Sequence, residues 1–189
     1  TGDNTSNVST TIGTTTNLAT VNNTAASYTT GSATTITMDM SNTGTNIPSG
    51  AGWTASLPVN FASTTWTCAI TVGTGSCGTA SGSGNTATLA NVALNTGATA
   101  RITFTTTPTT AGTVTTNSSV TVPSGWTDSA AGNNTSNVST TLSAPANMAG
   151  AWVDATNPVP VLQGSTYTQT VKLFNDGGTT ATGVRYVHT

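Results

Sequence analysis

Apolar and polar residues alternate in short stretches of this chain, as they do in strands that bury one face. Two stretches show the alternation clearly, and their apolar positions are Ile36, Met38, Met40, Ala100, Ile102 and Phe104. Turn-forming Gly, Pro, Asn and Asp residues separate such stretches. The pattern predicts strands over residues 17–23, 34–41, 53–59, 64–70, 87–94, 99–107, 112–122 and 133–142.

Seven or eight short strands with one apolar face each are typical of two antiparallel sheets packed face to face. Threonine supplies 49 of the 189 residues, and Glu is absent. Because β-branched residues favour an extended backbone, this composition also indicates strands. Disorder is the alternative for such a polar chain, but 34% hydrophobic residues and four Trp argue against it. The sequence therefore predicts an all-β, immunoglobulin-like antiparallel β-sandwich.

A nine-residue segment near the start recurs 130 positions later. Residues 3–11 and 133–141 are identical at eight of nine positions, and self-similarity at a fixed long spacing indicates a tandem repeat. Shorter matches follow at a spacing of 130 and then 133, which implies a three-residue insertion. The predicted parts are the final strand of a preceding repeat (1–11), a complete repeat (12–141) and the first part of a following repeat (142–189).

The two cysteines indicate a disulfide and an oxidising compartment. Cys68 and Cys77 are nine positions apart, and Gly73 and Gly75 lie between them. Across a predicted hairpin, this spacing allows a disulfide that holds a local loop. Free thiols are the alternative. A metal site needs more ligands than two cysteines, and residues 12–141 contain no His. Disulfides persist outside the cytosol, so the chain is expected to be secreted or on the cell surface.

Several segments together resemble the bacterial surface repeat known as domain of unknown function eleven. The segments that carry the resemblance are Gly164–Thr168, Asn175–Gly177, Leu57–Pro58 before Phe61, Trp66–Cys68 with Cys77, Ala111–Val114 before Asn117, and Asp128 followed by Asn133–Ser136. The chain departs from the family at Ser56, where Asp is usual. The resemblance implies an immunoglobulin-like module in long secreted or surface-anchored proteins, used as stalk, coat or adhesion material. It implies no catalytic residues.

Charge and residue types exclude several functions. Three basic residues give no footprint for nucleic acid, and no apolar run reaches the length of a membrane span. The only His, His188, cannot join a Ser-His-Asp arrangement within residues 12–141. We therefore predict no enzyme, no catalytic residue, no cofactor and no metal. The alternative is calcium bound by oxygen atoms at a domain junction, from Asp128, Asn133, Asn134 or Asp154.

The leading functional prediction is a structural module of an extracellular filament, stalk or cell-surface coat. Its partners would be copies of itself or adjacent repeats. The residues predicted to make contacts between repeats or subunits are Trp126, Trp152, Asn133, Asn134 and Val138. The alternative is an adhesin that recognises a glycan or surface ligand, and a glycan array without hits would count against it. The four Trp are expected in the core or at junctions rather than on a carbohydrate platform.

Two further alternatives concern the surface and the two ends of the chain. Outward Thr pairs suit O-linked sugars, which mass spectrometry would detect, and they are also found on ice-binding faces. Thr is so frequent here that such pairs carry little information. If residues 1–11 belong to a 189-residue subunit, they could insert into the open sheet of the next copy. A longer continuous chain is the favoured interpretation.

Overall fold

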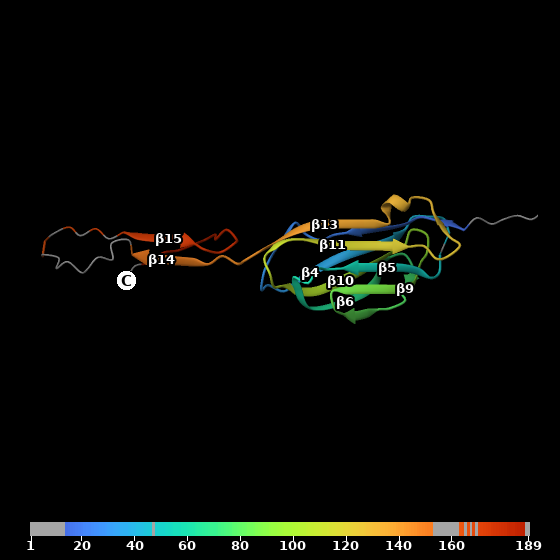
Figure 1. Ribbon diagram of the computed structural model, residues 1–189, viewed down its shortest axis with the longest axis horizontal. Coiled ribbons are helices and arrows are strands. Elements are labelled where there is room, and N and C mark those ends of the chain that lie inside the picture. Colours follow the sequence, from blue (N-terminus) through green and yellow to red (C-terminus); the bar gives the residue numbers. More distant parts are fainter. Residues whose placement is uncertain are drawn as a thin grey trace, which may run out of the picture.

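The computed structural model describes residues 14–46, 48–152, 163–164, 166, 168 and 170–187, and its regular structure is almost entirely β (Figure 1). The predicted terminal strand at 1–11, together with Asp154 and His188, lies outside these residues. Two sheets pack face to face as an immunoglobulin-like sandwich, so the predicted fold class is confirmed. No helix among the described residues has the length and apolar character needed to cross a membrane.

One sheet of the sandwich has five strands. In spatial order they are β2 (Leu18–Asn22), β4 (Thr34–Asn42), β10 (Thr99–Pro108), β6 (Phe61–Val72) and β8 (Ser81–Ser83). Every neighbouring pair in this sheet is antiparallel. The long strand β10 lies in the middle and pairs with β4 on one side and β6 on the other.

The facing sheet has six strands. In spatial order they are β3 (Ser27–Thr29), β13 (Thr135–Ser143), β11 (Gly112–Thr121), β5 (Ala51–Ser56), β9 (Thr86–Leu94) and β7 (Gly75–Ser76). Only the β3–β13 pair is parallel. Outside both sheets, β1 (Thr15–Thr16) pairs with β12 (Thr127–Asp128), and β14 (Met148–Trp152) pairs with β15 (Val171–Asn175). A short 3-10 helix spans Ala131–Asn133.

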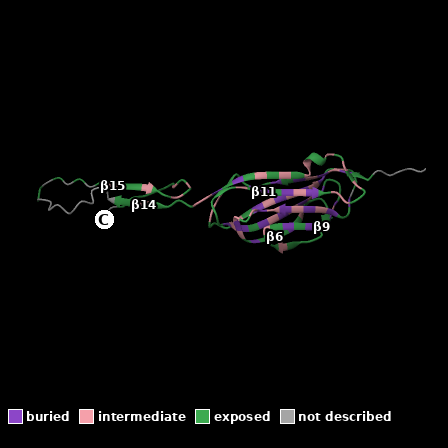
Figure 2. Cartoon of the chain, in the orientation of Figure 1, coloured by how far each residue is buried: buried purple, intermediate pink, exposed green. Residues whose placement is uncertain are grey.

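The core lies between the two sheets and follows the predicted alternation. Strand β4 buries every second side chain from Ile36 to Asn42, and β10 buries Ala100, Ile102 and Phe104. The bands of buried and exposed residues along the strands are visible in Figure 2. Trp53 and Trp66 are buried at 1% and 7% exposure, so both contribute to the core rather than to a surface platform.

Hydroxyl groups also enter this core, because Thr occupies several of its inward-facing positions. The buried hydroxyl residues are Thr16, Thr20, Thr24, Thr64, Thr106, Thr116, Thr140 and Ser118. They hydrogen-bond largely to each other: Thr64 Oγ1 lies 2.8 Å from Thr106 Oγ1, and Thr24 Oγ1 lies 2.9 Å from Thr116 Oγ1. Pairing removes most of the cost of burying a polar group, so Thr is tolerated on inward faces.

The predicted strands exist, with boundaries that shift for local reasons. Strand β5 ends at Ser56 because Leu57 and Pro58 follow, and Pro lacks the N–H that a ladder needs. The last strand of the sandwich begins at Thr135 rather than at Asn133, since Asn133 is the last residue of the 3-10 turn and Asn134 caps that turn. Strands β3, β7 and β8 were not predicted. They have two or three residues each, too few to show alternation.

Candidate functional site

The segment that enters the sandwich is held by a distant stretch of the chain. Strand β1 runs parallel to β12, with Thr15 opposite Thr127. The amide of Thr127 donates to Thr14 O at 2.8 Å, and the amide of Ser129 donates to Thr16 O at 2.8 Å. Residues 14–18 are therefore fixed to the turn that follows β11, and we call this contact the entry clamp.

Asp128 is the central side chain of the entry clamp. Its Oδ2 accepts the amide N–H of Leu18 at 3.0 Å, and its Oδ1 accepts the amide of Ala130 at 2.9 Å. A carboxylate that accepts two backbone amides makes charge-assisted hydrogen bonds, which are stronger than neutral ones. One side chain thus connects the first residue of β2 with the turn before β13.

Asn133 and Asn134 extend the entry clamp. The carboxamide of Asn133 donates to Asn17 Oδ1 at 3.0 Å, and the carbonyl of Asn134 accepts the amide of Val120 at 2.9 Å. The side-chain oxygens of both asparagines are buried, and neither has a hydrogen-bond partner within the described part of the chain. These residues were predicted to contact a neighbouring repeat, and the contacts seen here lie within the sandwich.

The other predicted contact residues have different surroundings. Trp126 is half-buried in the turn between β11 and β12, and its amide donates to Pro123 O at 3.1 Å. Val138 is half-buried on β13, and its carbonyl accepts the hydroxyl of Thr116 at 3.4 Å. Trp152 ends β14, and its side chain lies outside the described residues. Their role between repeats stays a prediction.

A shallow hollow of about 240 Å³ lies beside the entry clamp. Its lining is uncharged and consists of Thr15, Thr16, Asn17, Thr43, Gly44, Thr45, Asn46 and Ser129. Gly44 allows the chain to approach closely here, because a Cβ on it would lie 2.4 Å from Asn17 N. The described residues contain no group of three or more His, Cys, Asp or Glu side chains that could hold a metal ion.

The β14–β15 pair repeats the geometry of the β2–β4 pair. Leu18 is opposite Asn42, and at offsets of 130 and 133 Met148 is opposite Asn175. The correspondence holds for all five residue pairs of each ladder. The turn is repeated too. Asn42 Oδ1 accepts the Gly44 amide at 2.9 Å, and Asn175 Oδ1 accepts the Gly177 amide at 2.9 Å.

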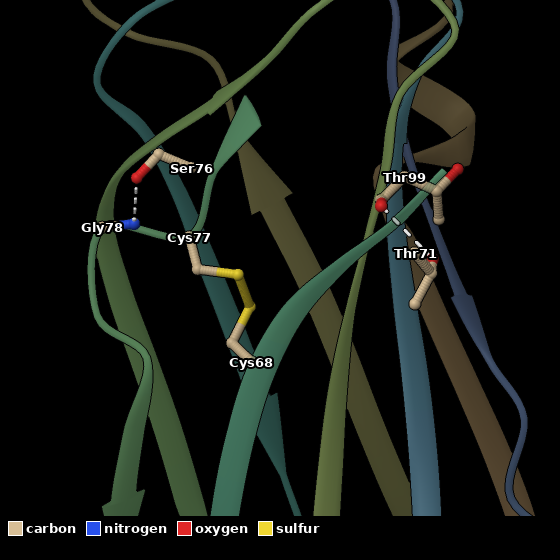
Figure 3. The surroundings of a disulfide bond; sticks show 6 residues. All are labelled: Cys68, Thr71, Ser76, Cys77, Gly78 and Thr99. Carbon is tan, nitrogen blue, oxygen red and sulfur yellow. Dashed lines mark hydrogen bonds between the residues drawn. A yellow bond between two sulfur atoms is a disulfide. The ribbon is translucent and has the colours of Figure 1, made fainter. Parts of the chain in front are cut away.

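The disulfide connects the two sheets and does not join the two strands of a hairpin. Cys68 lies on β6 of the five-stranded sheet, whereas Cys77 directly follows β7 of the six-stranded sheet (Figure 3). The bond Cys68–Cys77 is confirmed, with Cα atoms 6.1 Å apart. The predicted hairpin is wrong, because β7 pairs with β9 while β6 pairs with β8 and β10. Glycine-rich residues at 73–75 let the chain cross between the sheets.

Hydroxyl groups cover the outer surfaces of both sheets. On the five-stranded sheet the registers align Thr37, Thr103, Thr67 and Ser81 in one row and Thr35, Thr105, Thr65 and Ser83 in the next. Thr113 and Thr115 stand opposite Thr141 and Ser139 on the other sheet. Since both sheets carry such rows, the hydroxyl groups are a general property of the surface and do not distinguish one site from another.

One ion pair interrupts these rows, and it is the only one among the described residues. Arg101 on β10 stands directly opposite Asp39 on β4. Arg101 Nε lies 2.7 Å from Asp39 Oδ1, and Nη2 lies 2.7 Å from Oδ2. This hydrogen bonding and the charge of Asp39 raise the pKa of Arg101 above its ordinary value.

The chain matches no protein-family model and no curated protein by sequence. Among solved structures, it is similar to the CARDB domain of a Pyrococcus furiosus protein in complex with di-metal ions. The identity is 16%, the TM-score is 0.45, and the match covers 75% of this chain and 98% of that chain. It is also similar to AvmM, described as catalysing macrocyclization in alchivemycin A biosynthesis. That match has 9% identity and a TM-score of 0.37, and it covers 67% of this chain and 88% of that chain.

Proposed function

We propose that this chain is a structural part of an extracellular filament, stalk or cell-surface coat built from tandem β-sandwich units. One observation carries the proposal: the β14–β15 ladder has the register and turn of the β2–β4 ladder that opens the sandwich. A chain that starts the same construction twice fits an array in which each unit contacts its neighbours.

The entry clamp supports this function. In an array, the segment that enters a sandwich is also the connection from the preceding unit. Here that segment is bound to the same sandwich through Asp128 and through the β1–β12 pair. A connection held in this way limits the angles between consecutive units. A stalk or filament needs this stiffness, because a flexible linker behaves as a random coil.

Surface and disulfide are compatible with an extracellular material. The sandwich has a nearly uncharged, hydroxyl-covered surface, so little electrostatic repulsion opposes side-by-side packing. A disulfide between the sheets persists in an oxidising environment. The proposed partners are therefore further units of the same kind, either in one chain or in neighbouring chains.

The first test is the mass of the native polypeptide after full denaturation, with and without reductant. A mass several-fold above 18.7 kDa, together with beaded filaments or a surface layer in electron micrographs, is the expected result. A native polypeptide near 18.7 kDa that stays monomeric at high concentration would contradict the proposal.

A further inference from the structure

The free edge of β15 corresponds to an edge that is occupied in the sandwich. Strand β4 pairs with β2 on one side and with β10 on the other. Within the described residues, β15 pairs with β14 alone, although it stands in the place of β4. An edge strand with unpaired backbone groups is a template for another strand. The geometry of the sandwich defines which strand that would be, namely an antiparallel neighbour in the position of β10.

Among the residues that the structure describes, none covers the apolar face of this strand pair as the second sheet covers that of β2 and β4. Leu18 and Met40 are 0% exposed in the sandwich, whereas their counterparts Met148 and Leu173 are 40% and 44% exposed. A two-stranded ribbon with such a face is marginal alone and becomes stable when further strands cover it. Tyr186 lies at the offset of 133 from Trp53 and lines a pocket of about 140 Å³ with Gly150, Ala151 and Val171. The first covering residue is therefore already near this face.

The charge on β15 restricts which strand can pair with it, and strand β10 of the sandwich carries the wrong charge for this edge. Asp39 on β4 faces Arg101 on β10. At the offset of 133, the position of Asp39 is taken by Lys172 of β15. A strand identical to β10 would place Arg101 opposite Lys172, and like charges directly across a ladder are unfavourable. A carboxylate at that register position would form the reversed ion pair.

We propose that the β15 edge binds an antiparallel strand of the β10 type that carries Asp or Glu opposite Lys172. The occupant is a further stretch of the same polypeptide, which completes a second sandwich. The first sandwich of another copy does not fit, since its β10 is paired on both sides and carries the wrong charge. This inference rests on the proposed function, because it requires a second unit.

A chimeric chain tests the pairing directly. At an offset of 133, Thr189 corresponds to Ser56, so a copy of residues 57–142 is appended after Thr189. One version keeps Arg at the appended copy of position 101, and the other has Arg101→Asp in that copy. Amide hydrogen exchange at Val171–Asn175 then reports the opening of β15. The Asp version is expected to show protection about two- to tenfold greater than the Arg version.

The charge of Lys172 supplies the control. Lys172→Thr should remove the difference between the two versions, and Lys172→Asp should reverse it, so that the Arg version becomes the better protected. Both results are specific to the proposed register. A preference for Asp that survives Lys172→Thr would overturn the pairing, and so would equal protection in the two versions with Lys172 intact.

A second experiment covers a chimera that fails to fold. Synthetic peptides of residues 97–109, with Arg or with Asp at position 101, are added to the 189-residue chain, and NMR follows the β15 amides. Larger shifts with the Asp peptide support the proposal, and no shift with either peptide refutes it. Concentration-dependent protection of β15 without any peptide would make a second copy the occupant and would also refute it. The proposed filament is judged separately by polypeptide mass and microscopy.

Discussion

Trp53 and Ser118 are joined by a hydrogen bond inside the core, where the indole N–H donates to Ser118 Oγ at 3.0 Å. Ser118 Oγ also lies 2.5 Å from Thr20 Oγ1 of the facing sheet. Thr20 in turn donates to the carbonyl of Asp39 at 2.9 Å. All three side chains are thereby satisfied, and the chain of hydrogen bonds connects the six-stranded sheet to the five-stranded one.

Ser118→Ala should destabilise the sandwich by about 1–3 kcal/mol, because it leaves the buried Trp53 N–H and the Thr20 hydroxyl without this partner. Urea unfolding followed by Trp fluorescence measures the change. The matched control is Ser119→Ala, since Ser119 is the next residue on β11 and points to the outer face. The control should change the free energy of unfolding by less than about 0.5 kcal/mol. Equal effects of the two substitutions would contradict the role given to Ser118.

Gly44→Ala should destabilise the sandwich by about 1–3 kcal/mol through overpacking. The new Cβ would lie 2.4 Å from Asn17 N and 2.9 Å from Thr16 C, and backbone atoms cannot move aside cheaply. Urea unfolding again gives the magnitude. Gly132→Ala is the control, because a Cβ there meets nothing within 4 Å, and it should be neutral or slightly stabilising.

The same substitution in the second strand pair tests the repeated turn. A Cβ on Gly177 would lie 2.1 Å from Pro145 O and 2.4 Å from Asn147 N. Gly177→Ala should therefore increase hydrogen exchange in β14 and β15 while the urea midpoint of the sandwich stays constant. Unchanged exchange would show that the two turns are not equivalent. A shift of the sandwich midpoint would show that the stability of the sandwich depends on the second strand pair.

The alternation of apolar and polar residues was sufficient to predict the strands that are long and have one apolar face. Strands β4 and β10 have 9 and 10 residues, and their inward positions follow from the period of two. The same reasoning missed β7 and β8, because two or three Gly and Ser residues carry no hydrophobic signal. Such short strands form because a neighbouring strand pairs with them, as Thr65 of β6 pairs with Ser83 of β8.

The candidate site was less predictable than the fold, for a physical reason. Asp128 lies 110 positions from Leu18 in the sequence, and only the folded sandwich brings the two residues together. Its sequence context indicates a turn, and nothing local specifies which amides the carboxylate accepts. The disulfide pairing could be predicted because the chain has only two cysteines. Its position between the sheets could not, because the crossing depends on which sheet β7 joins.

Loss of the disulfide should lower the free energy of unfolding by about 2–3 kcal/mol, as expected for a cross-link across nine positions. The double substitution Cys68→Ala/Cys77→Ala and the reduced native chain should agree in urea unfolding. Because both sulfurs belong to buried residues, reduction should require partial unfolding. The same reductant should leave the double variant unchanged. A loss below about 0.5 kcal/mol would contradict the stabilising role given to the bond.

Asp128→Ala should open the entry clamp. It removes the acceptor of both the Leu18 and the Ala130 amides, at an expected cost of about 1–3 kcal/mol. The Leu18 amide should exchange faster with solvent, and urea unfolding should show the loss of stability. Asp128→Asn retains only one acceptor oxygen and should fall between the native chain and Asp128→Ala.

The neighbouring exposed residue supplies the control for this last prediction. Ser129→Ala removes a side chain beside Asp128 but keeps the backbone amide that donates to Thr16 O, so it should have little effect. Unchanged exchange at Leu18 in Asp128→Ala would mean that the β1–β12 ladder alone holds the entry segment. In that case the stiffness between units would depend on backbone pairing, and the carboxylate would serve only the turn at 128–130.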